Sequence, residues 1–255
     1  MKSAVLSVLL FEFVLSYGLA SARVEDNCDS PWTNDNHIES NVLPQSGCSV
    51  TAKQGNDVYD DLWDENTDIA NQTLKTDFLQ QMQSGALQAE RYVNFTLQDI
   101  YYLQKVTEML WEMKNKVKEP KDMSDFMSGR YNSYNNFLVS CLKQFHIKDP
   151  SSVTPIPAME KYLSTYKEVM ADRDPVYFAV ALLPCSRLWP WLAKNLNITK
   201  TNAYYTWKES NSGGHPETHF RLILDRYLNT TEKIQNAERI FRKQMQNEHD
   251  FFNSS

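Results

Sequence analysis

Two reactive side chains of this sequence lie in apolar surroundings. Cys185 follows Pro184 in the aliphatic and aromatic run YFAVALLPCSRLWPWLAKN, residues 177–195. Asp99 and Tyr102 lie three residues apart, so a helix places them on one apolar face. A thiol becomes a nucleophile when it ionises, and a carboxyl group on an apolar face needs a partner or a function. Asp99 therefore either binds a ligand or forms a hydrogen bond with a buried Tyr or Arg that holds helices together.

A second acid lies near the C-terminus. Glu248 precedes Phe251 and Phe252 in MQNEHDFFNSS by three and four residues, so a helix brings the acid and these aromatic rings together. The spacing alone is a weak signal, because acids near a chain end are usually solvated. Glu248 is a candidate for acid or base chemistry only in combination with other residues.

The sequence GGHPETH raises the question of a metal site. His215 and His219 lie four residues apart, a spacing that binds zinc when both face one side of a helix. A Gly-Gly-His-Pro turn precedes them, and no third ligand follows at a recognisable spacing. We favour a capping or surface role, and we expect neither a metal nor another cofactor. The sequence also contains no phosphate-binding glycine loop and no Gly-x-Ser-x-Gly elbow.

Helices must position these side chains. The whole chain has only seven glycines, and from residue 57 onward apolar residues recur at spacings of three and four. No run alternates long enough to predict a strand. The sequence therefore predicts an all-α, multi-helix bundle with a binding site between facing helices. The predicted helices cover residues 58–83, 87–117, 123–145, 157–171, 175–196, 202–210, 218–228 and 231–252.

The first 22 residues are typical of a signal peptide. Lys2 precedes an apolar stretch over residues 4–17, and small residues end the segment at Ala22. The stretch is too short to span a membrane, and we expect no second hydrophobic segment after it. The sequence thus predicts a secreted, extracellular protein. Five Asn-x-Ser/Thr tripeptides agree with the secretory pathway and must face solvent if they carry glycans; they begin at Asn71, Asn94, Asn197, Asn229 and Asn253.

Residues 23–56 are polar and lack a periodic apolar face, so we expect an irregular N-terminal extension. Cys28 and Cys48 are well placed to close it into a disulfide loop; a partly disordered tail is the alternative. The four cysteines allow three pairings. We favour Cys28 with Cys48, which leaves Cys141 as a buried thiol, whereas pairing of Cys141 with Cys185 would remove the nucleophile.

Charge excludes some partners. The formal net charge is −6, and the basic residues are dispersed along the chain. A protein that binds nucleic acid or an anionic membrane needs a basic patch. We therefore expect neither as a partner, and a small molecule as the ligand.

Four stretches resemble motifs of the TenA family, also called thiaminase II. The stretches occur in the same order as the family's motifs. The first resembles the stretch with Phe and Gly-x-Leu that leads into the family's Gln-Asp helix, and the second resembles its Pro-Cys helix. The third resembles its Tyr-x-x-Trp segment, and the fourth its closing Glu-x-x-Phe-Trp. Together they cover a region from about residue 57 to 252, which is more specific than any one motif. The stretches are FLQQMQSGALQAERYVNFTLQDIYYL (78–103), ALLPCSRLWPWLAKNL (181–196), AYYTWKESN (203–211) and NEHDFF (247–252).

The resemblance implies a haem-oxygenase-like helical domain over residues 57–255 and a pocket for the aminopyrimidine half of thiamin. By motif position, Cys185 is the nucleophile that adds to the pyrimidine ring, and Glu248 is the acid/base that serves the ring. Asp99 holds the ring nitrogen and the exocyclic amine, with Tyr102 beside it. Relatives are often tetramers, so the resemblance also leaves a homo-oligomer open.

Two positions depart from the family pattern. Trp189 and Asn211 stand where the family usually has tyrosines, and both are expected to line the pocket near the leaving group or the second nucleophile. We also expect Pro184 to start or kink a helix, so that free amide dipoles lower the pKa of Cys185. Two hypotheses remain. The first is a secreted thiaminase that acts by hydrolysis or by base exchange with an amine or thiol, and the second is a secreted carrier of thiamin or another small aromatic ligand.

Overall fold

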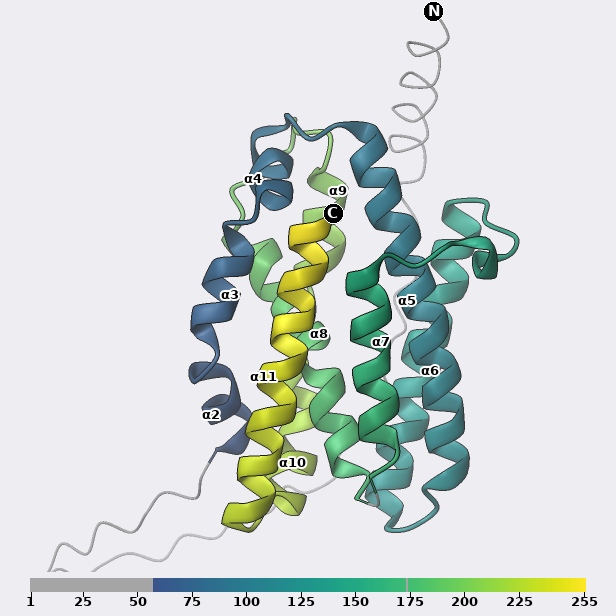
Figure 1. The fold of residues 1–255 in the computed structure, drawn as a ribbon, viewed down its shortest axis with the longest axis vertical. Coiled ribbons are helices and arrows are strands. Elements are labelled where there is room, and N and C mark those ends of the chain that lie inside the picture. Colours follow the sequence, from purple (N-terminus) through teal and green to yellow (C-terminus); the bar gives the residue numbers. More distant parts are fainter. Residues whose placement is uncertain (1–56, 173) are drawn as a thin grey trace, which may run out of the picture. The chain divides into compact units, whose positions relative to one another are not determined.

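The computed structural model describes residues 57–172 and 174–255 (Figure 1). Within that part the chain forms ten α-helices and one short 3-10 helix, with no strand, so the all-α prediction is confirmed. The signal peptide, the extension and the Cys28–Cys48 disulfide lie outside the described residues. The elements are α2 (Val58–Asp64), α3 (Thr67–Leu74), α4 (Asp77–Ser84), α5 (Ala89–Lys116), α6 (Lys121–Gln144), η1 (Pro150–Ser152), α7 (Pro157–Met170), α8 (Val176–Asn195), α9 (Tyr205–Asn211), α10 (Glu217–Tyr227) and α11 (Thr231–Ser254).

The last helix, α11, organises the bundle. It packs along α8, α7 and α3, and Figure 1 shows it, in yellow, between α3 and α7 with α8 behind it. Helix α5 pairs with α6 and also packs on α7. Helices α5, α7, α8 and α11 therefore share one interior, and these four carry the side chains of the site.

Helix α8 is the most apolar element of the bundle. We expect no second hydrophobic segment from the sequence, yet α8 is long and apolar enough to cross a membrane by length and composition alone, with a mean hydropathy of 1.3. The apolar composition of α8 fits its position in the bundle, because 67% of that window is buried inside the protein. Every residue from Val176 to Pro184 is buried. A helix that is apolar all round is typical of a bundle centre as well as of a membrane.

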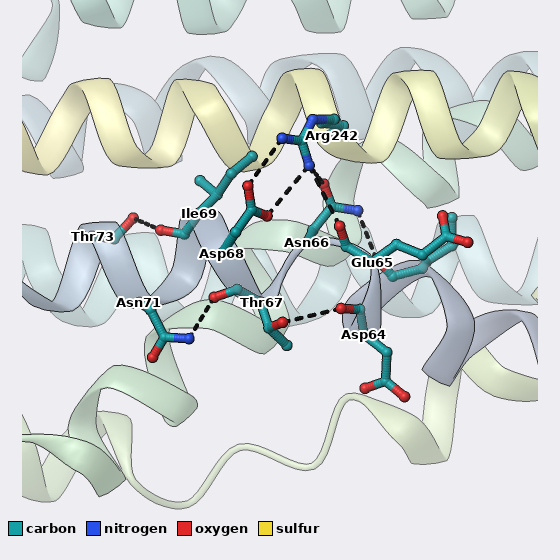
Figure 2. A network of polar contacts seen from close by, with 10 residues as sticks. Asp64, Glu65, Asn66, Thr67, Asp68, Ile69, Asn71, Thr73 and Arg242 are labelled. Carbon is teal, nitrogen blue, oxygen red and sulfur yellow. Dashed lines mark hydrogen bonds and ion pairs between the residues drawn. The ribbon is translucent and has the colours of Figure 1, made fainter.

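The predicted helix over residues 58–83 is divided into α2, α3 and α4. At the first break the Asn66 side chain donates to the Leu62 carbonyl (2.8 Å), and at the second Thr76 Oγ1 donates to the Thr73 carbonyl (2.8 Å). Such side-chain bonds to the backbone compete with helix continuation. Figure 2 shows how α3 is tied to α11: Arg242 donates to Asn66 Oδ1 (3.1 Å) and to Asp68 Oδ2 (3.0 Å).

Candidate active site

Four helices bring their polar side chains to one narrow cavity, in which the side chains leave no space for a water molecule. Helix α5 supplies an acid and a tyrosine, α7 a second tyrosine, α8 the thiol and an indole, and α11 the second acid. Five of the six side chains that the sequence assigns to catalysis or substrate binding therefore meet. The cavity is lined by Asp99, Tyr102, Met159, Tyr162, Cys185, Trp189, Glu248 and Phe251.

Glu248 is the best-held group of the site. It is 1% exposed, and both carboxyl oxygens accept hydrogen bonds. Tyr162 Oη donates to Oε1 (2.5 Å), and Trp189 Nε1 donates to Oε2 (3.1 Å). Burial raises the pKa of Glu248 to about 7, although hydrogen bonds with Tyr162, Trp189 and Cys185 act in the opposite direction. The group can therefore give or take a proton near neutral pH.

Asp99 is the second carboxyl group of the cavity. Burial, and then the nearby Glu248 carboxyl, raise the pKa of Asp99 to about 7. Two neighbouring carboxyl groups in a buried site disfavour the doubly ionised state, so their titrations are coupled. The cavity thus holds one negative charge more readily than two, which suits a ligand that brings a positive charge or several N–H donors.

Cys185 differs from its prediction. Pro184 and Pro190 lie inside α8, so Cys185 is in the middle of a helix rather than at its start. The pKa of its thiol is raised well above the usual value, first by burial and then by the Glu248 carboxyl, while hydrogen bonds from Tyr102 and Tyr134 offset part of the rise. The predicted lowering of the thiol pKa by free amide dipoles is therefore wrong. The thiol of Cys185 is therefore neutral in the free site. Both Cys185 and Cys141 are free cysteines.

A group of tyrosines surrounds the thiol and the acid, and the sequence analysis missed most of it. Tyr102 Oη and Tyr166 Oη lie 2.8 Å apart, and the rings of Tyr162 and Tyr166 stack with centroids 5.3 Å apart. The available signal was the pair Tyr162 and Tyr166, four residues apart in EKYLSTYKE and hence on one helix face. Periodicity alone marks them as core, since it does not show that the Tyr162 hydroxyl group bonds an acid from α11.

Asn211 is the one predicted pocket residue that does not line this cavity. Its side-chain amide donates to the Trp207 carbonyl one turn earlier on α9 (2.8 Å). Contact of Asn211 with a ligand stays a prediction. Trp189, by contrast, does line the cavity.

The remaining predicted sites lie at the surface. His215 Nδ1 is 3.0 Å from Glu217 Oε1, and both side chains are exposed to a large extent. Across residues 57–172 and 174–255, no group of three or more His, Cys, Asp or Glu side chains is arranged to hold a metal ion. The asparagine of every tripeptide is exposed, as glycosylation requires: Asn71, Asn94, Asn197, Asn229 and Asn253.

Residues 63–255 match the family model described as the TENA/THI-4/PQQC family. The chain belongs to this family. The match covers all four helices that form the cavity, so the motif resemblance and the family model agree on the same region. No curated protein sequence matches the chain.

Three solved structures are similar to this member of the TENA/THI-4/PQQC family. A TenA homologue from P. horikoshii OT3 is 20% identical, with a TM-score of 0.60 over 76% of this chain and 96% of that one. A TenA homologue from Pyrococcus furiosus is 15% identical, with a TM-score of 0.64 over 77% and 98%. A TenA family transcription regulator from Silicibacter sp. TM1040 is 15% identical, with a TM-score of 0.66 over 80% and 98%. At these identities the likeness shows the fold.

Proposed function

We propose that this protein is a thiaminase, which cleaves thiamin or a related aminopyrimidine at the methylene group that joins the pyrimidine to its leaving group. One observation carries the proposal. Cys185, Asp99 and Glu248 lie far apart in the sequence but line one cavity. Membership of the TENA/THI-4/PQQC family agrees with it, because that family includes thiaminases.

Substrate binding is assigned to Asp99 and the rings around it. An aminopyrimidine presents an exocyclic amine and ring nitrogens along one edge, and the half-buried carboxyl group of Asp99 can accept from the amine and share a proton with a ring nitrogen. Tyr102 lies one turn from Asp99 on α5. The flat faces of Trp189 and Phe251, which also line the cavity, suit stacking with a planar ring.

In the proposed reaction the thiol adds to a ring carbon. The electrons of the ring C=N bond move to nitrogen, which takes a proton from Glu248, and the proton of the Cys185 thiol replaces it on the carboxylate. The electrons on the ring nitrogen then expel the leaving group from the methylene. A second nucleophile, either water or an amine or thiol base, adds to the methylene, and the electrons return to the ring nitrogen. The ring nitrogen then gives its proton back to Glu248 and re-forms the C=N bond, while the Cys185 sulfur leaves with its bonding electrons and takes the proton held by Glu248, which restores the aromatic ring and the thiol.

The raised thiol pKa fits this order of events. A standing thiolate beside two carboxyl groups is unfavourable, so the S–H proton leaves as the sulfur adds. Glu248 accepts it because a group with a pKa of about 7 can exchange protons at neutral pH.

The carrier hypothesis is supported by a different observation. The thiol of the free site is neutral, and the side chains around it leave no space for even a water molecule, whereas small-molecule pockets typically enclose about 300–1,000 Å³. A ligand must therefore displace side chains on entry. A protein that binds thiamin in this way without cleaving it would be a carrier.

We also propose that the protein is secreted. The support is the leader-like start of the sequence and the five exposed tripeptide asparagines. Expression in a eukaryotic secretory host tests this: the protein should appear in the medium, and glycosidase treatment should reduce its mass. Retention inside the cell without glycans would contradict the proposal.

The decisive experiment for the activity uses purified protein with reduced Cys185 and thiamin, with and without pyridine. The loss of thiamin and the mass of the pyrimidine product are measured. Cleavage without pyridine indicates hydrolysis, and cleavage that depends on pyridine indicates base exchange. Thiamin binding without cleavage under both conditions contradicts the thiaminase proposal and supports the carrier.

A further inference from the structure

We infer that Trp189 is a positioning residue: its indole N–H holds the second oxygen of Glu248 and thereby fixes the orientation of the acid that serves the substrate ring. This inference rests on the proposed function. The sequence assigns Trp189 to substrate contact, but the only donor of its side chain is already bonded to Glu248. Its ring lines the cavity, whereas its N–H is already engaged.

The bonds from Tyr162 and Trp189 hold the two oxygens of Glu248 from two different helices. Oε1 accepts from Tyr162 of α7 at 2.5 Å, and Oε2 accepts from Trp189 of α8 at 3.1 Å. Because an indole N–H can only donate, the Trp189 bond always requires an acceptor oxygen and favours the ionised acid. Rotation of the carboxyl group would break both bonds at once.

Trp189 is itself held by aromatic rings from three other elements. It stacks on Phe95 of α5 with centroids 5.8 Å apart and planes 24° apart. Phe252 of α11 lies 5.2 Å away and Trp207 of α9 lies 6.0 Å away, centroid to centroid. A ring packed in this way holds its N–H in one place before a substrate arrives, which is what a precise acid requires.

Several titratable groups face Glu248, and Trp189 is not one of them. Asp99 of α5, Tyr162 and Tyr166 of α7, and Cys185 of α8 all interact electrostatically with Glu248. From the opposite side, α3 presents Asp68 to Arg242 and Thr73 to His249. Because Trp189 carries no charge, its replacement changes the titration of Glu248 mainly through the hydrogen bond.

The test replaces Trp189 with a ring that lacks the N–H. In Trp189→Phe we expect the pH midpoint assigned to Glu248 in the kcat/KM profile to rise by about one unit, because a donor to the ionised acid is lost. The midpoint is assigned by its absence in Glu248→Gln. KM should change little at a pH below both midpoints. A residue that only filled space would lower the rate at every pH without moving the midpoint.

The chain offers a matched control in Trp207. This indole packs against Trp189, and within the described residues its Nε1 has no hydrogen-bond partner. Trp207→Phe should therefore leave the midpoint in place. If Trp189→Phe does not fold, incorporation of 3-benzothienylalanine at position 189 keeps the ring shape and still removes the N–H.

The outcomes separate this inference from the proposed function. If the wild-type protein cleaves thiamin and the midpoint is the same in Trp189→Phe, the inference is wrong. If the wild-type protein does not cleave thiamin, the proposed function fails, and the carboxyl titration is followed by infrared difference spectroscopy instead. A Glu248 band that titrates about one unit higher in Trp189→Phe supports the inference, and an unshifted band overturns it.

Discussion

Helix α11 takes part in two carboxyl networks, one exposed to solvent and paired with a cation, the other buried among neutral donors. Toward its middle, Arg242 pairs with Asp68 of α3, and the two side chains are 54% and 50% exposed (Figure 2). Six residues later, Glu248 of α11 bonds Tyr162 and Trp189 and is 1% exposed. The hydrogen bond from Arg242 lowers the pKa of Asp68, whereas burial raises the pKa of Glu248 to about 7.

The difference shows that hydrogen bonding alone does not set the protonation of an acid. Both carboxyl groups accept good hydrogen bonds, but only Asp68 has a cation beside it and water around it. Glu248 has neutral donors and no solvent, so the protonated form gains relative to the ionised form. An acid of the first kind ties helices together, and an acid of the second kind can exchange protons at neutral pH. Substitution of Glu248 should therefore reduce activity, whereas substitutions at Arg242 or Asp68 should leave activity unchanged.

The largest effect on activity is expected at the thiol. Cys185→Ser removes the nucleophile, so thiamin cleavage should fall by at least about 1,000-fold. The isosteric change should leave folding intact, which circular dichroism and the thermal midpoint would check. Cys141→Ser is the control, because Cys141 is a buried thiol that does not line the cavity. Cleavage at the wild-type rate in Cys185→Ser would remove the covalent mechanism.

The next effect is expected at the acid. Glu248→Gln keeps the shape but cannot transfer a proton, so kcat should fall by about 100-fold to 10,000-fold while thiamin binding is largely spared. Asp68→Asn is the matched change in the other network and should leave kcat unchanged. Turnover and calorimetric binding measure the two quantities. An undiminished kcat in Glu248→Gln would mean that another group carries the proton.

Stability against pH gives a smaller and independent comparison. The pKa of Glu248 is raised from 4.5 to about 7 on folding, so the folded state holds its proton more tightly. This contribution is fully present below the unfolded pKa and is lost as pH rises through the folded one. The thermal midpoint of the wild type should thus decline between about pH 5 and pH 8, and Glu248→Gln should flatten that decline.

Asp68 provides the control of opposite sign. Its pKa is lowered on folding, so its contribution is present above the unfolded value of 3.8 and is lost only as pH falls through the lowered one. Asp68→Asn should therefore leave the slope between about pH 5 and pH 8 as it is in the wild type. Equal slopes in the wild type and Glu248→Gln would show that Glu248 does not titrate in this range.

The sequence predicted the fold better than the electrostatics of the site. Apolar spacing marked α5, α7, α8 and α11 within a few residues, and motif position named Cys185, Asp99 and Glu248, which the structure brings together. It did not predict the breaks at Asn66 and Thr76, because those depend on side-chain bonds to the backbone.

The thiol pKa could not be predicted for a physical reason. Pro184 suggested a helix start, but the sequence cannot show that α8 continues through Cys185, nor that an acid from α11 faces the sulfur. The bond from Trp189 to Glu248 joins residues 59 positions apart, so it too requires the tertiary structure. Local patterns therefore identify which residues carry chemistry, and the packing of distant helices decides their charge.

The smallest effect is expected at the exposed network. Arg242→Ala removes the ion pair with Asp68 and the bond to Asn66, yet exposed pairs contribute only about 0–1 kcal/mol because water and salt screen them. The free energy of unfolding, measured by urea titration, should fall by less than about 1 kcal/mol, and the loss should shrink further in high salt. Thiamin turnover should stay at the wild-type level, because Arg242 does not line the cavity. A large loss of turnover would show instead that the position of α3 on α11 controls Glu248, and the two networks would then be coupled.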